Sequence, residues 1–261
     1  MDHSAELGFS LLHTFWRRCI KIYEGFPPPK FSLVKLSVIL PTYNERENLP
    51  ELIAQIRRLQ IEVECVIVDD NSPDGTGELA DQLAATDPLI KVIHRPRKAG
   101  LASAVYAGLS KASAQYVAVM DADLQHPPHL LTQMFRALED GYDVVVASRY
   151  VRGGGVVGWS VLRHIISRVA TLLAHLIIPR SRAVKDPMSG YFALKREVLE
   201  SVRIDSSIGY KLLLTILVKG RYSKIKEVPM IFRRRLKGES KLTQKEILTY
   251  LKLLLNLLRQ R

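Results

Sequence analysis

The sequence has little cysteine and no long hydrophobic run. Two cysteines, Cys19 and Cys65, occur in 261 residues, and their spacing fits neither a metal site nor a disulfide framework. This scarcity excludes a disulfide-rich secreted scaffold and favours a reducing, cytosol-facing compartment. The apolar stretch at residues 7–16 is too short to cross a bilayer. Acidic residues precede it and Arg17 and Arg18 follow it, which reverses the charge order of a secretory signal.

Acidic residues are also few relative to basic ones. The chain has 38 Lys and Arg against 26 Asp and Glu, a net charge of +12. This excess favours an anionic partner, which could be nucleic acid, phospholipid headgroups or a phosphorylated substrate. No internal repeat or low-complexity linker interrupts the chain, so we predict one large domain at residues 35–241. Residues 1–34 are expected to be an extension, either a peripheral membrane tether or a segment without a part in the chemistry.

Short β-branched runs alternate with segments of helical period from residue 36 onward. We predict strands at residues 36–40, 64–68, 91–94, 116–120 and 142–147. Between the first two, one helical face carries Leu49, Leu52, Ile53, Ile56 and Leu59. Apolar strands joined by helices predict the doubly wound α/β class, a mostly parallel sheet with helices on both faces. Ligands of such sheets bind beyond the carboxyl ends of the strands.

Polar clusters follow three of these predicted strands, at residues 41–45, 69–75 and 121–125. Asp70, Asp121 and Asp123 should therefore meet at one edge of the sheet. In a chain of net positive charge, such a cluster suggests a bound Mg²⁺ or Mn²⁺, which would neutralise a departing nucleoside diphosphate. The alternatives are that the acids only form turns, or that Asp70 accepts hydrogen bonds from a base or ribose.

The alternation of predicted strands and helices ends past residue 150. Residues 159–178 are strongly apolar but contain Arg163, His164, Arg168 and His175. A guanidinium at the centre of a spanning helix costs about 2.5–3.5 kcal/mol, so we predict an amphipathic helix in the membrane interface. Residues 242–261 predict a basic amphipathic helix, suited either to an anionic membrane surface or to packing on the domain.

Six motifs occur in order between about residues 35 and 245. They are Val38-Ile39-Leu40-Pro41-Thr42-Tyr43-Asn44-Glu45, Asp69-Asp70-Asn71-Ser72-Pro73-Asp74-Gly75-Thr76, Met120-Asp121-Ala122-Asp123-Leu124-Gln125-His126-Pro127-Pro128, Ala147-Ser148-Arg149-Tyr150, Asp186-Pro187-Met188-Ser189-Gly190-Tyr191-Phe192 and Gly238-Glu239-Ser240-Lys241. Together they resemble the dolichyl-phosphate mannose synthases, inverting family-two glycosyltransferases. The resemblance implies a GT-A fold, GDP-mannose as donor, dolichyl or another polyprenyl phosphate as acceptor, and Mg²⁺ or Mn²⁺.

The resemblance also assigns roles residue by residue. It implies donor binding by Pro41, Tyr43, Glu45, Val68, Asp70, Asp121, Ala122, Asp123, Met188, Lys211, Arg235 and Lys241, and a loop at residues 237–241 that closes over the substrate. The implied metal ligands are Asp123 and Gln125, and the implied acceptor-phosphate ligands are Arg149, Arg163 and Ser167. Asp121, Asp123 and Arg149 would be catalytic. A phosphate monoester is already anionic at neutral pH, so no general base is required.

Other functions stay open at this point. The nearest is a polyprenyl-phosphate glucosyltransferase that uses UDP-glucose. A nucleic-acid-binding protein would use the basic residues 233–241, but it lacks stacking aromatic runs and leaves the acids unexplained. An inactive membrane scaffold is disfavoured because every acid of the cluster is present. Some relatives carry transmembrane helices after the catalytic domain. Without them, we expect a peripheral membrane protein at the cytosolic face, held by interfacial helices or by a small membrane-anchoring subunit.

Overall fold

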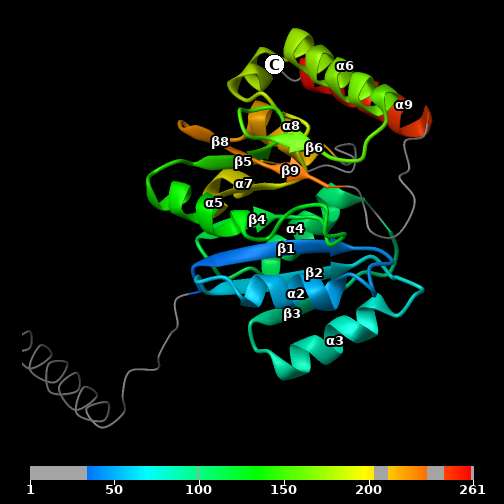
Figure 1. Cartoon of the computed structure of the whole chain (residues 1–261), viewed down its shortest axis with the longest axis vertical. Coiled ribbons are helices and arrows are strands. Elements are labelled where there is room, and N and C mark those ends of the chain that lie inside the picture. The colour runs from blue at the N-terminus through cyan, green and yellow to red at the C-terminus, as the bar shows by residue number, and fades with distance from the viewer. Residues whose placement is uncertain (1–33, 99, 203–210, 234–243, 260–261) are drawn as a thin grey trace, which may run out of the picture. The chain divides into compact units, whose positions relative to one another are not determined.

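The computed structural model describes residues 34–98, 100–202, 211–233 and 244–259 (Figure 1). Seven strands of this part form one sheet in the order β3-β2-β1-β4-β7-β5-β8. Their bounds are β1 Leu36–Thr42, β2 Val63–Asp69, β3 Ile90–His94, β4 Tyr116–Val119, β5 Val144–Ser148, β7 Phe192–Lys195 and β8 Ile225–Pro229. Strand β7 is antiparallel to its neighbours β4 and β5, and the other pairs are parallel. The predicted mostly parallel sheet is confirmed.

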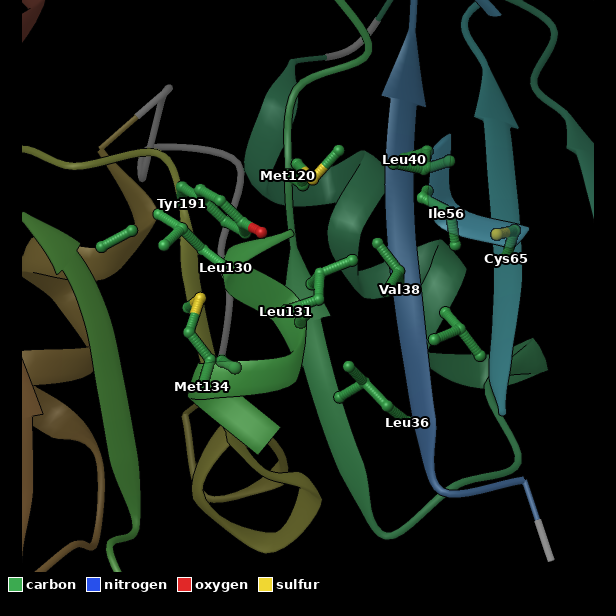
Figure 2. Close-up of a cluster of buried hydrophobic side chains, with 14 of the residues drawn as sticks. Leu36, Val38, Leu40, Ile56, Cys65, Met120, Leu130, Leu131, Met134 and Tyr191 are labelled. Atoms are coloured by element: carbon green, nitrogen blue, oxygen red, sulfur yellow. The ribbon is translucent and has the colours of Figure 1, made fainter. Parts of the chain in front are cut away.

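Helices cover both faces of this sheet. Their bounds are α2 Leu49–Arg57, α3 Thr76–Thr86, α4 Leu101–Lys111, α5 Leu130–Glu139, α6 Val161–Ile177, α7 Arg196–Glu200, α8 Leu212–Lys219 and α9 Gln244–Arg259. Helices α2, α3 and α5 contribute to one hydrophobic core, and α4, α7 and α8 to the other. Leu36, Val38 and Leu40 of β1 face the first core (Figure 2), whereas Ile39 faces the second. Successive side chains of a strand point to opposite sides, so both cores are built from the same strands.

Two later strands of the sheet, β7 and β8, were not predicted from the sequence. Strand β7 has four residues and β8 has five. Runs this short give too few alternations to separate a strand from other buried segments. A further pair of two-residue strands, β6 (Gly155–Val156) and β9 (Ile231–Phe232), was not predicted either.

Helix α4 lies unusually close to the sheet at Gly108. A Cβ atom added there would be 2.5 Å from Ile39 Cγ2 of β1 and 3.2 Å from Val68 Cγ2 of β2. Glycine is therefore required for the separation between α4 and these two strands. The N-terminal end of α4 follows the β3 loop at the carboxyl edge, so this packing also sets the position of that loop.

Helices α6 and α9 lie side by side and contact each other (Figure 1). Tyr250 of α9 donates a hydrogen bond from its hydroxyl to the carbonyl oxygen of Ala170 in α6, at 2.6 Å. Four residues of α9 are buried in a cluster with α6 and α8, namely Tyr250, Leu253, Leu254 and Leu257. Of the two alternatives for the C-terminal helix, packing on the domain is therefore realised.

Both helices nevertheless leave apolar side chains on the surface. The exposed ones are Val161, Leu162, Ile165, Val169, Leu172 and Leu176 on α6, and Leu251, Leu255 and Leu258 on α9. We call these nine side chains the apolar face. Within the described ranges, no helix has both the length and the apolar character needed to cross a membrane.

Candidate active site

The topology of the sheet brings the predicted polar loops to one edge. Strand β1 pairs in parallel with β2 on one side and with β4 on the other, so the carboxyl ends of all three are neighbours. Asn44, Asn71 and Leu124 follow these three strands and have positive φ angles of 61°, 59° and 61°. They are the non-glycine residues with positive φ in the described part of the chain. Asparagine tolerates this conformation, but leucine is strained in it, and such strain concentrates at functional sites.

The strained turn at Leu124 brings the two predicted metal ligands together. The backbone N–H of Gln125 donates to Oδ1 of Asp123 at 3.1 Å, and both side chains are buried. The amide Nε2 of Gln125 donates to the carbonyl oxygen of Arg233 at 2.7 Å. By contrast, the Asp121 side chain is 40% exposed. Asp123 and Gln125 are thus fixed and buried, whereas the Asp121 side chain is partly exposed to solvent.

His126 closes this loop and was not identified from the sequence. Its Nδ1 accepts a hydrogen bond from the backbone N–H of Asp121 at 3.1 Å. The buried imidazole stacks on Tyr191 at 5.1 Å between ring centroids and meets the edge of Phe232 at 5.5 Å. Both aromatic partners are distant in sequence, so the local motif gave no sign of this packing.

The donor atoms of Asp123 and Gln125 suit a hard divalent cation. In the described residues, no group of three or more His, Cys, Asp or Glu side chains is placed to hold a metal ion. The three acids that the sequence predicted to meet there, Asp70, Asp121 and Asp123, therefore do not form such a group. The ligand set implied by the resemblance, Asp123 and Gln125, is smaller and consists of one carboxylate and one amide. Mg²⁺ commonly binds one or two protein ligands together with substrate phosphates. The residues present therefore fit a cation that binds together with a diphosphate.

Asp70, the acid predicted to bind the nucleoside, is paired with an arginine that the sequence analysis missed. Arg95 Nη1 lies 2.9 Å from Asp70 Oδ1, and both side chains are largely buried. Arg95 Nη2 donates to Ser103 Oγ at 2.8 Å, and the backbone N–H of Arg95 donates to the Asp69 carbonyl at 2.8 Å. Arg95 therefore ties the end of β2 to the first turn of α4.

Two other predicted donor residues lie in the loop after β1. The ammonium of Lys98 lies over the Tyr43 ring, 3.7 Å from its centroid. Glu45 Oε2 accepts a hydrogen bond from Asn48 Nδ2 at 2.7 Å. Tyr43 and Lys98 come from the loops after β1 and β3, so their contact joins two loops of the carboxyl edge.

The remaining residues predicted to bind the sugar-nucleotide donor are spread over several elements of the fold. Pro41 pairs with Val68 at the ends of β1 and β2. The Val68 side chain is fully buried in the core beneath α4 and Ala122 is also buried, whereas Met188 packs with α6, α8 and α9. Lys211 immediately precedes α8. Arg235, Lys241 and the predicted closing loop at residues 237–241 lie outside the described residues, as does the extension at residues 1–33.

Arg149, predicted to bind the acceptor phosphate, follows β5 and forms a buried ion pair with Asp186. Nε and Nη2 of Arg149 donate to the two Asp186 oxygens at 2.8 and 2.7 Å. Burial by itself lowers the pKa of Arg149, but the hydrogen bonds and charge of Asp186 outweigh it and raise the pKa above its usual value. The guanidinium is therefore permanently charged and fixed in orientation.

The other two predicted acceptor ligands, Arg163 and Ser167, lie on α6. Ser160 caps this helix and accepts a hydrogen bond from the Arg163 backbone N–H at 3.3 Å. Ser167 Oγ is 2.7 Å from the hydroxyl oxygen of Tyr150, the residue next to Arg149. The structure thus connects Arg149 and Ser167 through Tyr150.

This sheet, with acidic loops at its carboxyl edge and helices on both faces, is that of a GT-A glycosyltransferase. The glycosyl transferase family 2 model matches residues 37–203, and the chain belongs to this family. It is 48% identical over 221 residues to the dolichol-phosphate mannosyltransferase of Pyrococcus furiosus, a match that covers 84% of this chain and 62% of that protein. The polyprenol monophosphomannose synthase of Mycolicibacterium smegmatis is 38% identical, with 80% and 82% covered.

Solved structures share the fold at lower sequence identity. Glucosyl-3-phosphoglycerate synthase of Mycobacterium tuberculosis, solved with Mn²⁺, UDP-glucose and phosphoglyceric acid, gives a TM-score of 0.65 at 20% identity, with 86% of this chain and 80% of that chain covered. A mannosyltransferase of Pyrobaculum calidifontis, solved with GDP-Man and Mn²⁺, gives 0.58 at 22% identity, with 91% and 67% covered. At these identities the likeness concerns the fold.

Proposed function

We propose that this protein transfers mannose from GDP-mannose to dolichyl phosphate or another polyprenyl phosphate, with inversion at the anomeric carbon. The observation that carries the proposal is that the acidic loop after β4 and the segment leading into α6 contact the same aromatic residue, Phe232. Phe232 contacts His126 of the acidic loop and also Trp159, at 5.5 and 5.7 Å between ring centroids. Trp159 lies two residues before the start of α6, which carries Arg163 and Ser167. A diphosphate and a phosphate monoester would therefore bind next to each other.

The proposed reaction is a single displacement. An oxygen of the lipid phosphate attacks the anomeric carbon, the bond from that carbon to the diphosphate breaks, and GDP leaves with the electron pair. An α-linked donor then gives a β-linked mannosyl phosphate. Arg149, Arg163 and Ser167 would position the acceptor, whose own charge makes it the nucleophile. Asp123 and Gln125 would hold Mg²⁺ or Mn²⁺, which neutralises the charge of the diphosphate.

The proposed location is the surface of a membrane, at its cytosolic face. Six side chains of the apolar face and the basic residues Arg163 and Arg168 lie on the same helix, α6. A helix of this kind buries its apolar side in the acyl region while its cations meet anionic headgroups. A polyprenyl phosphate in a membrane carries its phosphate at the depth of these headgroups. A small membrane-anchoring subunit stays a prediction.

A transfer assay tests the proposal directly. The purified full chain would be incubated with a polyprenyl phosphate, Mg²⁺ or Mn²⁺, and radiolabelled GDP-mannose or UDP-glucose in parallel, and label in the organic phase would be counted. Label from GDP-mannose is expected. Label from UDP-glucose instead would identify the glucosyltransferase alternative, and no label from either donor would contradict the proposal.

A further inference from the structure

Cations and aromatic rings alternate between the end of β5 and helix α6. In order, the side chains are Arg168, Tyr150, Arg149, Trp159 and Arg163. From one side chain to the next, the distances between guanidinium carbon and ring centroid are 3.9, 5.2, 5.5 and 4.2 Å. All four lie within the roughly 6 Å over which a ring attracts a cation. We call these five side chains the arginine–aromatic stack.

The stack connects all three residues predicted to bind the acceptor phosphate. Arg149 and Arg163 lie beside Trp159, and Ser167 is hydrogen-bonded to Tyr150 at 2.7 Å. Neither Tyr150 nor Trp159 was predicted to belong to the site. Each of the three predicted acceptor ligands is therefore in contact with Tyr150, with Trp159 or with both.

Aromatic rings at these positions solve an electrostatic problem. Guanidinium groups that converge on one phosphate repel each other in the absence of that phosphate. The negative face of a ring attracts the cations beside it and keeps them apart, while their N–H edges remain able to reach a phosphate. Asp186 binds the Nε and Nη2 atoms of Arg149, which leaves Nη1 of that residue outside the ion pair.

Within the described part of the chain, a hydrogen bond of the indole N–H does not explain why residue 159 is a tryptophan. Trp159 Nε1 is buried and has no hydrogen-bond partner among the described residues. A buried donor without a partner is costly, and phenylalanine would avoid this cost. The contacts with Arg149 and Arg163 explain a tryptophan here, because tryptophan is the ring that attracts cations most strongly.

We propose that Tyr150 and Trp159 are positioning residues that hold Arg149, Arg163 and Ser167 ready for a phosphate monoester, the head group of a polyprenyl phosphate. The inference rests on the proposed function, since it concerns the acceptor of that reaction. It assigns these two residues to acceptor recognition and not to donor binding.

The first test compares KM values for the two substrates. Trp159→Leu should raise KM for polyprenyl phosphate about five- to thirtyfold, because two cation–ring contacts are lost. Trp159→Phe should raise it about two- to threefold, and Tyr150→Phe by a similar factor through loss of the contact with Ser167. KM for the donor should change less than twofold in each. Tyr106→Leu, at an exposed tyrosine of α4, is the matched control and should change neither value.

These variants can contradict the proposal even if Trp159→Leu folds poorly, which thermal unfolding would reveal. The conservative variants Trp159→Phe and Tyr150→Phe keep the ring. Unchanged KM for polyprenyl phosphate in both would overturn the proposal. Equal increases of KM for donor and acceptor would overturn it as well, because they indicate a general structural role.

A binding measurement separates this inference from the proposed transfer. Trp16 and Trp159 are the two tryptophans of the chain, so Trp16→Phe makes Trp159 the sole indole fluorophore. Titration with farnesyl phosphate, without donor, should change the Trp159 emission with saturation. No saturable change, or a change with phosphatidic acid vesicles alone, would overturn the inference. A saturable change in a protein that transfers no sugar would support the inference and contradict the proposed function.

Discussion

Arg149 and Asp186, 37 residues apart, are joined by two parallel hydrogen bonds in the interior of the domain. The Arg149 side chain is 9% exposed and that of Asp186 is fully buried. The backbone N–H of Arg149 also donates to Asp186 Oδ2, at 3.0 Å. Asp186 in turn is held through its own backbone N–H, which donates to Glu227 at 3.1 Å. This pair fixes the first residue after β5 against the segment that leads into β7.

Asp186→Asn is expected to lower the free energy of unfolding by about 3 kcal/mol. The change leaves the buried guanidinium of Arg149 without its counter-charge. Urea denaturation of the purified variant measures the loss. Asp81→Asn is the control, because Asp81 pairs with His94 on the surface, where an ion pair contributes little. Equal stability of the two variants would contradict the importance of the buried pair.

Asp123→Asn is expected to reduce transfer at least a hundredfold and to weaken Mn²⁺ binding in the presence of GDP. Asparagine keeps the size of the buried side chain and an oxygen for the Gln125 N–H, so the fold should persist. Mn²⁺ binding is measured by electron paramagnetic resonance. Asp140→Asn, at the exposed end of α5, is the control. Wild-type Mn²⁺ affinity in Asp123→Asn would rule out this carboxylate as a ligand.

Arg95→Met is expected to weaken GDP binding about tenfold, because Asp70 would lose the cation that holds it. Isothermal titration calorimetry with GDP measures the affinity without the acceptor. Arg97→Met removes an exposed arginine two residues away and should leave the affinity unchanged. Should both variants bind GDP alike, the orientation of Asp70 does not depend on Arg95.

Leu124 should be replaceable by asparagine more easily than by valine. Asparagine tolerates a positive φ, whereas a β-branched residue is strongly disfavoured there. Leu124→Val is expected to be less stable than Leu124→Asn by about 1–2 kcal/mol. Denaturant unfolding gives this difference. The reverse order of stability would show that packing of residue 124, and not backbone strain, decides the outcome.

Asp143 is expected to stabilise the fold in a pH-dependent way. Burial by itself raises its pKa, but hydrogen bonds from Lys195, Ser223 and the Lys224 backbone outweigh burial and lower the pKa well below its usual value. The native state therefore favours the ionised carboxylate. Its stabilisation is complete above the unfolded-state pKa of about 4 and is lost as pH falls through the lower folded-state pKa.

The matching experiment compares Asp143→Asn with the wild type over pH. The variant should be less stable at pH 7, and the difference in the free energy of unfolding should shrink as pH falls below about 4. Asp81→Asn again provides the comparison with an exposed acid. A stability difference that stays constant between pH 7 and pH 3 would contradict the assigned cause.

The sequence alone determined the class of fold and the edge of the sheet at which the predicted polar loops gather. The spacing of hydrophobic residues is a local property, so the alternation of strands and helices could be predicted from the sequence. All five predicted strands are present, with bounds that differ by at most a few residues. The carboxyl ends of neighbouring parallel strands lie at one edge. The acidic loops after β1, β2 and β4 could therefore be placed together before any tertiary contact was known.

Only the tertiary structure decided which side chains meet across that edge. Strand β7 lies antiparallel between β4 and β5, and the segment before it carries Asp186 to Arg149. The packing of α9 on α6, the pairing of Arg95 with Asp70 and the arginine–aromatic stack depend in the same way on segments distant in the chain. Such contacts leave no local period in the sequence, because they arise when the two hydrophobic cores fix the elements that carry them.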